Sequence, residues 1–417
     1  MRNILFIPLL CLLTLKVGFA QNPAILQVNL AKPGAPIQPT MWGIFFEDIN
    51  FGADGGIYAE LVKNRSFEFY QPLMGWKTEK TAETSGSVLV QNRGTDLPNP
   101  RFVRVQKKSE TGKLGLSNEG FRGMGFRQGE SYVFSLDGRV PEGTAPVSLR
   151  IELLNPAGTV IGNTSLSITG KNWTSQNVTL TCNQTTPHGS LALWLENAGT
   201  VDLDMISLFP THTWKNRPSG LRPDLVQLLA DLKPGFLRFP GGCIVEGREL
   251  NTRYQWKKTV GPVQQREMIV NRWNTEFNHR LTPDYFQTFG LGFYEYFLLS
   301  EDIGAEPLPI LNCGMACQFN SGEVVPMDDL DPYIQDALDL IEFANGSVQS
   351  TWGKLRADMG HPEPFDMKFL GVGNEQWGEQ YIERYKAFEK ILRAKHPEIK
   401  LVSAVGPFPD GEQFDYL

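Results

Sequence analysis

The chain has 417 residues, of which 41% are hydrophobic and 20% are charged, a balance typical of folded globular proteins. This composition excludes a long disordered tail, and the length is enough for more than one domain. The 39 basic and 46 acidic residues give a formal net charge of −7, which disfavours binding to a phosphate backbone. We therefore expect a folded protein that does not bind nucleic acid.

The N-terminal residues 1–20 have the layout of a secretory signal peptide. Arg2 precedes an apolar stretch from Ile4 to Leu15, and the small residues Gly18 and Ala20 suit a cleavage site after Ala20. The apolar stretch is too short to span a membrane. The sequence thus predicts an exported protein, periplasmic or secreted, without a membrane anchor.

Removal of that segment leaves four cysteines, Cys182, Cys243, Cys313 and Cys317. So few cysteines in a chain of this length do not form a disulfide framework, and we expect buried free thiols. A disulfide between Cys313 and Cys317 is the alternative for an oxidising compartment. With five histidines and no Cys/His spacing of the zinc type, we expect no metal site.

Residues 21–210 fall into two regions with different patterns. In residues 21–65, an apolar strand over 43–48 carries Glu47 at its end, a glycine-rich stretch follows, and residues 57–62 predict a short helix. Residues 66–210 alternate apolar and polar side chains with period two, as in Val147, Leu149, Ile151 and Leu153, with turn dipeptides between the runs. This second pattern predicts an inserted antiparallel β-sandwich.

Residues 211–417 alternate helices and strands. We expect helices that begin at Pro223, span 290–303, begin at Asp331 and span 381–392, and strands over 236–239, 308–311, 368–372 and 400–405. Repeated βα units imply a parallel sheet of the α/β class, either a barrel or a doubly wound fold. Because no Gly-x-Gly-x-x-Gly turn is present, the barrel is favoured and no cofactor is expected.

Glu375 is the most informative residue of this region. It follows the strand over 368–372 and precedes a helix, and α/β barrels carry their chemistry where strands end and βα loops begin. The neighbouring Asn374, Gln376 and Trp377 suit a sugar, because amides bond hydroxyls and an indole packs on the apolar face of a sugar ring. The pattern indicates a carbohydrate-active site.

Five segments in this order carry a family resemblance: residues 43–47 with 55–58, 236–243, 290–297, 311–318 and 371–377. Together they resemble the α-L-arabinofuranosidases of glycoside hydrolase family 51, and the resemblance covers nearly all of the mature chain. It implies a (β/α)8 TIM barrel with an inserted sandwich that resembles a carbohydrate-binding module. It also implies a retaining mechanism, which places two carboxyl groups ~5–5.5 Å apart.

The resemblance also implies roles for individual residues. Glu375 matches the general acid/base after the fourth strand, and Asn374 matches the asparagine that bonds the 2-hydroxyl of the sugar. Glu47 matches a glutamate that holds sugar hydroxyls, Cys243 a residue that lines the subsite, and Trp273, more loosely, an aromatic near the sugar. The residues themselves leave open that Glu47 caps a turn and that Cys243 and Trp273 only pack.

The family's nucleophile ends the seventh strand, whereas this chain stops at Leu417, after its fifth. We therefore expect an incomplete barrel of about five strands, with residues 211–417 supplying strands two to five, without the nucleophile and inactive on its own. Arg238 is expected to support the site from behind. The implied activity is release of terminal arabinofuranose from arabinoxylan, arabinan or arabino-oligosaccharides. The implied partner is a plant cell-wall glycan that contains arabinose. The resemblance leaves open whether the full-length protein forms a homo-oligomer.

Two alternatives remain at this stage. The sandwich could be the functional part of the chain, which would then be a carbohydrate-binding or structural fragment. Trp173 and Trp194 are the candidate residues for contact with a glycan. The barrel could also belong to a glycosidase of the same clan with another specificity, because specificity depends on loops that the motifs do not fix. The sequence leaves the glycan, the linkage and the oligomeric state open.

Overall fold

The computed structural model describes residues 26–27, 31, 34–94, 96–141, 145–275 and 284–407. The predicted signal peptide and its cleavage site after Ala20 lie outside the described residues. The chain divides into two units at Gln38, and the few described residues of the first unit contain no helix or strand. Within the described ranges, no helix is long and apolar enough to cross a membrane.

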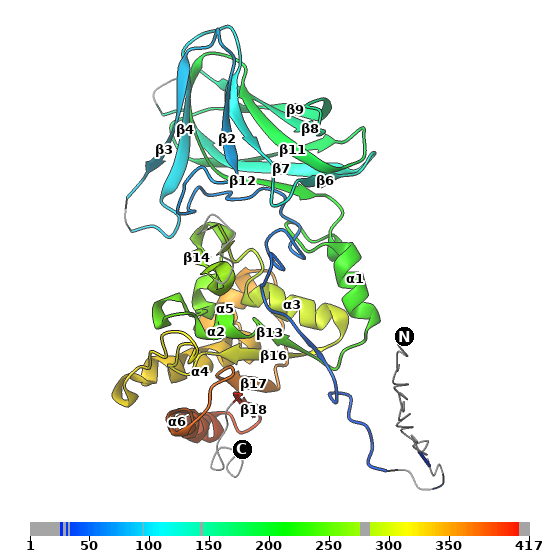
Figure 1. The fold of residues 1–417 in the computed structure, drawn as a ribbon, viewed down its shortest axis with the longest axis vertical. Helices are drawn as coiled ribbons and strands as arrows, with labels where there is room; N and C mark the ends of the chain where they lie inside the picture. The colour runs from blue at the N-terminus through cyan, green and yellow to red at the C-terminus, as the bar shows by residue number, and fades with distance from the viewer. Residues whose placement is uncertain are drawn as a thin grey trace, which may run out of the picture. The chain divides into compact units, whose positions relative to one another are not determined.

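A parallel sheet forms the framework of residues 211–407 and takes in the first strand of the second unit (Figure 1). Its order is β1 (Ile44–Phe45), β13 (Phe236–Phe239), β16 (Glu306–Leu311), β17 (Phe369–Val372) and β18 (Lys400–Ser403). Every neighbouring pair is parallel, which confirms the repeated βα units expected from the sequence. None of the described sheets is closed, and the carboxyl ends of these five strands share one edge.

The helices are α1 (Pro223–Asp231), α2 (Cys243–Glu246), α3 (Phe293–Ile303), α4 (Asp331–Asn345), α5 (Thr351–Asp358) and α6 (Glu379–Lys395). Proline lies in the first turn of α1 and of α4, where its missing N–H costs no hydrogen bond. In α1, Val226 is buried and Leu228 is exposed, as is Leu232, which follows the helix. Helix α3 begins three residues later than expected, since the backbone of Gly292 is extended.

Short elements complete the described part of residues 211–407. They are η1 (Trp214–Asn216), η2 (Leu250–Thr252), η3 (Trp256–Thr259), η4 (Val263–Gln265), η5 (Arg272–Thr275), η6 (Met327–Asp329) and the two-stranded pair β14 (Ile269–Val270) and β15 (Phe286–Gln287). The 3-10 turn η5 matters for the site because it carries Trp273.

The helix predicted over residues 57–62 is wrong. The backbone N–H groups of Ala59 and Leu61 donate to Gly220 and Leu208, which are distant in sequence, and Tyr58 forms an antiparallel bridge with Leu221. Ile57, Tyr58, Ala59 and Val62 are all buried. A segment with buried side chains on every side can pair with other segments, and here those tertiary contacts override the helical spacing.

Residues 76–210 form two antiparallel sheets (Figure 1). One has the order β10 (Thr174–Thr181), β7 (Ser131–Arg139), β12 (Gly199–Pro210), β4 (Arg101–Lys107) and β3 (Gly86–Asn92). The other has the order β2 (Trp76–Lys80), β5 (Leu114–Asn118), β11 (Thr186–Leu195), β8 (Val147–Leu154) and β9 (Val160–Ile168), with β6 (Met124–Phe126) also paired to β11. Residues such as Phe134 and Ile151, one from each sheet, are fully buried in one shared core. The period-two alternation therefore marks the buried face of each strand.

The aromatic core behind β13 holds the strand that leads into the site. Phe239, the last residue of β13, stacks on Tyr296 of α3 with ring centroids 4.9 Å apart. Phe293 and Phe297 of the same helix meet Phe239 edge-on. Full burial of one phenylalanine side chain contributes about 1.5–3 kcal/mol, so this cluster fixes the end of β13 firmly.

Candidate functional site

Four strands of the parallel sheet deliver polar side chains to one edge. Glu47 follows β1, Cys243 follows β13, Cys317 follows β16 and Glu375 follows β17. Because these strands are parallel, the residues that follow them meet at the carboxyl edge of the sheet. The candidate site is the set of side chains gathered there.

Glu375 lies on an unusual turn of the backbone. Its φ is +51°, in the left-handed region that non-glycine residues avoid, and Gly373 before it has φ of +81°. Holding a glutamate in this region costs on the order of 1 kcal/mol, and such conformations cluster at functional sites. The turn exposes the Glu375 side chain, and its Oε2 accepts a hydrogen bond from the Cys243 thiol at 3.3 Å.

A buried hydrogen-bond network holds the loop beneath Glu375. Asn374 Oδ1 accepts from Arg238 Nη2 at 2.6 Å, and Asn374 Nδ2 donates to Glu246 Oε2 at 3.1 Å. Gln376 Nε2 donates to the other oxygen of Glu246 at 2.9 Å. Gln376 is therefore turned inward and supports the loop, rather than facing a sugar as the sequence had suggested.

Glu47 and Trp273 form a second group at the same edge. Trp273 Nε1 donates to Glu47 Oε1 at 2.9 Å, and the backbone N–H of Ile244 donates to the same oxygen at 3.4 Å. Burial raises the pKa of Glu47, while these two hydrogen bonds lower it in part and the nearby charge of Glu375 raises it further. Trp273 thus lies in the site and is not simply part of a core.

Arg238 on β13 lies between these groups. Its Nη1 donates to the Gly241 carbonyl at 3.0 Å, and its guanidinium lies 5.2 Å from the centre of the Phe45 ring. Burial lowers the pKa of Arg238, whereas the charges of Glu47, Glu375 and Glu246 raise it. The supporting role expected for Arg238 is consistent with these contacts, since it orients Asn374 and offsets the carboxylates.

Two further residues of the site were missed in the sequence. Glu246 at the end of α2 and Cys317 after β16 both approach the Cys243 thiol. Burial, more than any other cause, raises the pKa of Glu246 to about 8, and the hydrogen bond with Cys317 raises the pKa of Cys243. Cys317 comes after β16, a position that could have identified it, whereas no sequence signal pointed to Glu246 at the end of α2.

The described cysteines Cys182, Cys243, Cys313 and Cys317 are free thiols. This agrees with the free thiols expected, and the alternative Cys313–Cys317 bridge is not formed. Cys313 is fully buried, and burial raises its pKa to about 12.

Asp48 anchors the glycine-rich stretch next to Glu47. It is buried and accepts hydrogen bonds from the Tyr285 hydroxyl at 2.6 Å and from the Ala53 N–H at 2.9 Å. Burial, followed by the charge of Asp54, raises the pKa of Asp48 to about 7. The Tyr285 hydroxyl also accepts from the Phe51 N–H at 2.9 Å, so the stretch is tied down on both sides of Gly52.

The combination of groups suits a neutral, polyhydroxylated ligand. The site offers an exposed carboxyl group at Glu375, a second carboxylate at Glu47 and the indole of Trp273. Trp377 adds another half-buried indole, and the backbone N–H of Trp377 donates to Gln318 Oε1 at 3.0 Å. Such a site can transfer a proton to an oxygen of a bound sugar while carboxylates and amides hold its hydroxyls.

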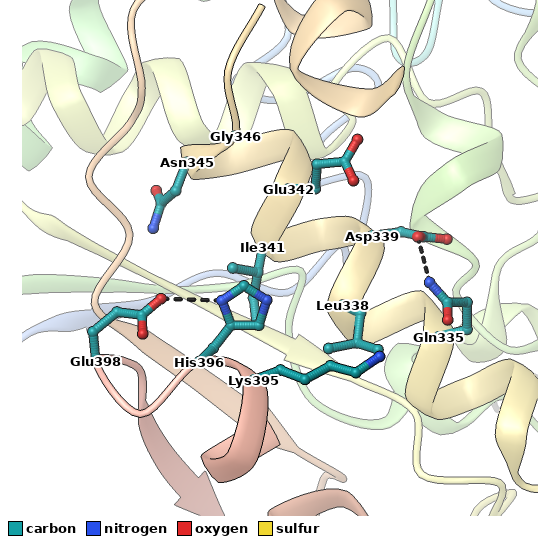
Figure 2. A pocket seen from close by; sticks show the side chains of 10 residues that line it. All are labelled: Gln335, Leu338, Asp339, Ile341, Glu342, Asn345, Gly346, Lys395, His396 and Glu398. Carbon is teal, nitrogen blue, oxygen red and sulfur yellow. Dashed lines mark hydrogen bonds and ion pairs between the residues drawn. The ribbon is translucent and has the colours of Figure 1, made fainter. Parts of the chain in front are cut away.

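A separate pocket lies between α4 and α6 (Figure 2). Its lining includes Asn345 at the end of α4, and His396 and Glu398, which precede β18. These positions lie at the amino end of the strands, opposite the edge that carries Glu375. The pocket contains none of the residues of the candidate site.

Comparisons with known proteins point to one family. The model described as "Alpha-L-arabinofuranosidase 1 domain" matches residues 228–416. The chain is 41% identical over 413 residues to an extracellular exo-α-L-arabinofuranosidase of Streptomyces chartreusis, and the match covers 93% of this chain and 46% of the relative. It is 34% identical over 410 residues to α-L-arabinofuranosidase 1 of Arabidopsis thaliana, with 94% and 58% covered.

A solved structure gives the same indication. An arabinose-bound family 51 α-L-arabinofuranosidase matches with a TM-score of 0.79 and 32% identity, covering 91% of this chain and 61% of that chain. The chain spans about half the length of the curated relatives it matches.

Proposed function

Because the chain belongs to the α-L-arabinofuranosidases of glycoside hydrolase family 51, we propose that its site binds a terminal α-L-arabinofuranosyl group with Glu375 as the general acid/base. The observation that carries this proposal is the placement of Glu375. Its carboxylate is exposed at the end of β17, on a left-handed turn that the buried Asn374 network holds in place.

The contacts of each residue support a distinct role. Glu375 protonates the leaving oxygen and later takes a proton from water. Glu47 uses Oε1 for Trp273 and Ile244, so Oε2 is the oxygen available to sugar hydroxyls. Asn374 gives one N–H to Glu246 and has a second for the 2-hydroxyl. Cys243 and Trp273 border the same subsite.

A retaining enzyme also needs a nucleophilic carboxylate, and those described at this edge have other partners. Glu246 is buried and receives hydrogen bonds from Asn374 and Gln376, while Glu47 is held by Trp273. We therefore propose that these 417 residues by themselves bind the sugar but do not hydrolyse its glycosides. Turnover of an aryl α-L-arabinofuranoside by the chain, abolished by Glu47→Gln, would contradict this and would assign Glu47 the nucleophile's role.

The finer features proposed for the protein follow the family. They are a (β/α)8 barrel built from residues 21–65 and from residue 211 onward, an inserted sandwich over residues 66–210, and exo action on arabinoxylan, arabinan or arabino-oligosaccharides. The relative from Streptomyces is named extracellular and exo-acting, which supports export behind a signal peptide cleaved after Ala20.

The sandwich is a weaker candidate for carbohydrate binding. The ring of Trp173 lies 4.1 Å from the guanidinium of Arg93 and 4.9 Å from that of Arg139, and Trp194 Nε1 donates to Glu152 at 2.8 Å. Both tryptophans therefore already have polar partners within the sandwich. Affinity electrophoresis of the chain in arabinoxylan tests this second function, and unchanged migration would leave the sandwich a structural unit.

The proposed activity can be tested in a chimera that continues this chain with the C-terminal part of the Streptomyces relative. Glu375→Ala should strongly reduce hydrolysis of natural arabinosides, whose leaving groups need protonation, and should affect aryl arabinosides with good leaving groups much less. Glu383→Ala, at an exposed position on α6, is the matched control and should leave both rates unchanged. Equal losses on both substrate classes would contradict the acid role.

A further inference from the structure

A cluster of potential metal ligands lies directly beside Glu375. The Sγ atoms of Cys243 and Cys317 and a carboxylate oxygen of Glu246 all lie within 4.8 Å of one another. Cys243 and Glu246 are the first and last residues of α2, three positions apart, which places them on the same face of one helical turn. Cys317 reaches them from the loop after β16.

These three groups have the chemistry that zinc requires. Zinc is bound by cysteine sulfur at about 2.3 Å and by carboxylate oxygen at about 2.0–2.2 Å, so the sulfurs of a tetrahedral site lie about 3.8 Å apart. Ligand atoms already within 4.8 Å need to move only slightly to reach that geometry. Three protein ligands leave one coordination position open.

The surrounding side chains already orient the carboxylate. Each oxygen of Glu246 accepts one amide hydrogen bond, from Asn374 Nδ2 at 3.1 Å and from Gln376 Nε2 at 2.9 Å. Metal-binding carboxylates are commonly held in this way by neighbours that do not touch the metal. The second lone pair on either oxygen stays available for a cation.

The Cys243 thiol supplies an independent observation. It has one proton, yet three acceptors surround its sulfur: Glu375, Glu246 and Cys317. Only one of them can receive the S–H at a time. A cation in place of the proton would satisfy the neighbouring acceptors together. Two cationic side chains lie nearby: Arg272 is hydrogen-bonded to Cys317, and the charge of Arg238 interacts with Glu246 and Glu375.

We propose that Cys243, Glu246 and Cys317 form a binding site for a thiophilic divalent cation of the zinc type, with Glu375 next to the open coordination position. On binding, each thiol releases its proton to solvent and donates a sulfur lone pair to the metal. Cys243 then has no S–H to donate to Glu375, and the cation occupies space at the sugar subsite. Bound metal therefore opposes sugar binding.

The proposal can be tested on the reduced full chain by titration with Co²⁺, which gives a strong near-ultraviolet absorption when thiolates bind it. We expect this absorption to saturate at one equivalent and to disappear when Zn²⁺ is added. Cys317→Ser should abolish it. Cys182→Ser is the matched control, because that cysteine lies in the sandwich with its thiol donating to the Gln184 carbonyl, and it should leave the absorption unchanged.

A second measurement uses the unaltered chain, so its result does not depend on whether a variant folds. Zn²⁺ should slow alkylation of Cys243 and Cys317 by iodoacetamide at least tenfold, read by peptide mass spectrometry, and should leave Cys182 and Cys313 unaffected. Absence of the thiolate–cobalt absorption, its persistence in Cys317→Ser, or equal alkylation rates with and without Zn²⁺ would overturn the proposal. So would a Cys243–Cys317 disulfide that persists after reduction.

Discussion

Replacement of Asp48 by asparagine should change how stability depends on pH. Asp48 is 1% exposed and accepts hydrogen bonds from Tyr285 and Ala53. Burial raises its pKa to about 7, and the charge of Asp54 adds to the effect. Asparagine keeps a side-chain oxygen for these donors but does not titrate, so Asp48→Asn removes the ionisation and preserves an acceptor.

The sign and size of the effect follow from the two pKa values. In the unfolded chain an aspartate titrates near ~3.9, whereas Asp48 in the folded chain titrates at about 7. Between these values the unfolded chain loses a proton that the folded chain keeps, so the free energy of unfolding falls as pH rises. Each unit is worth about 1.4 kcal/mol, which gives a total of about 4 kcal/mol. This stability is complete below pH ~4 and lost above pH ~7.

Urea unfolding at a series of pH values from about 4 to about 8 measures this contribution. The wild-type chain should lose stability with pH more steeply than Asp48→Asn, and the two curves should become parallel above pH ~7. Asp224→Asn is an opposite control, because a hydrogen bond from Arg222 lowers the pKa of that exposed carboxyl. Parallel curves for wild type and Asp48→Asn over the whole range would refute the reasoning.

Three further substitutions, one of them with a control at Gly304, test the packing around the site. Arg238→Met removes the hydrogen bonds to Asn374 and Gly241. We expect urea titration to show a loss of about 1.5–3 kcal/mol in the free energy of unfolding, and calorimetry to show weaker arabinose binding. Unchanged arabinose binding would contradict the positioning role of Arg238. Gly241→Ala would place a Cβ 2.5 Å from the Cβ of Glu47, so calorimetry should show weaker arabinose binding. Gly304→Ala is the control, because Gly304 also has a positive φ but faces open space; it should lower the free energy of unfolding and leave arabinose binding unchanged. Phe239→Ala should lower the free energy of unfolding by about 3–5 kcal/mol, since its ring is fully buried against α3; a loss below about 1 kcal/mol would contradict the packing described for β13.

Much of the fold was predictable because local signals agree with the tertiary structure. Helix α4 begins at Asp331, as the sequence indicated. Strand β13 has the predicted bounds. The helix prediction for residues 57–62 failed because a short, mostly apolar run does not distinguish a helix from an extended segment that pairs elsewhere.

The site was only partly predictable for a related reason. Position after a strand singled out Glu375, the family resemblance added Glu47 and Cys243, and the structure brings the three to one edge. The same rule applied to Cys317, but sequence spacing does not tell which loop residue turns inward and which faces solvent. Glu246 was hidden because its partners Asn374 and Gln376 come from another strand end, more than a hundred residues away.

The central claim is that Glu375 is the acid/base of a retaining arabinofuranosidase, and azide rescue tests it most directly. In the chimera carrying Glu375→Ala, an aryl α-L-arabinofuranoside should form a glycosyl-enzyme that lacks its base catalyst and accumulates. Added azide needs no base, so it should restore turnover and yield α-L-arabinofuranosyl azide, with retained configuration by NMR. No azide rescue, or an azide product of inverted configuration, would contradict the account.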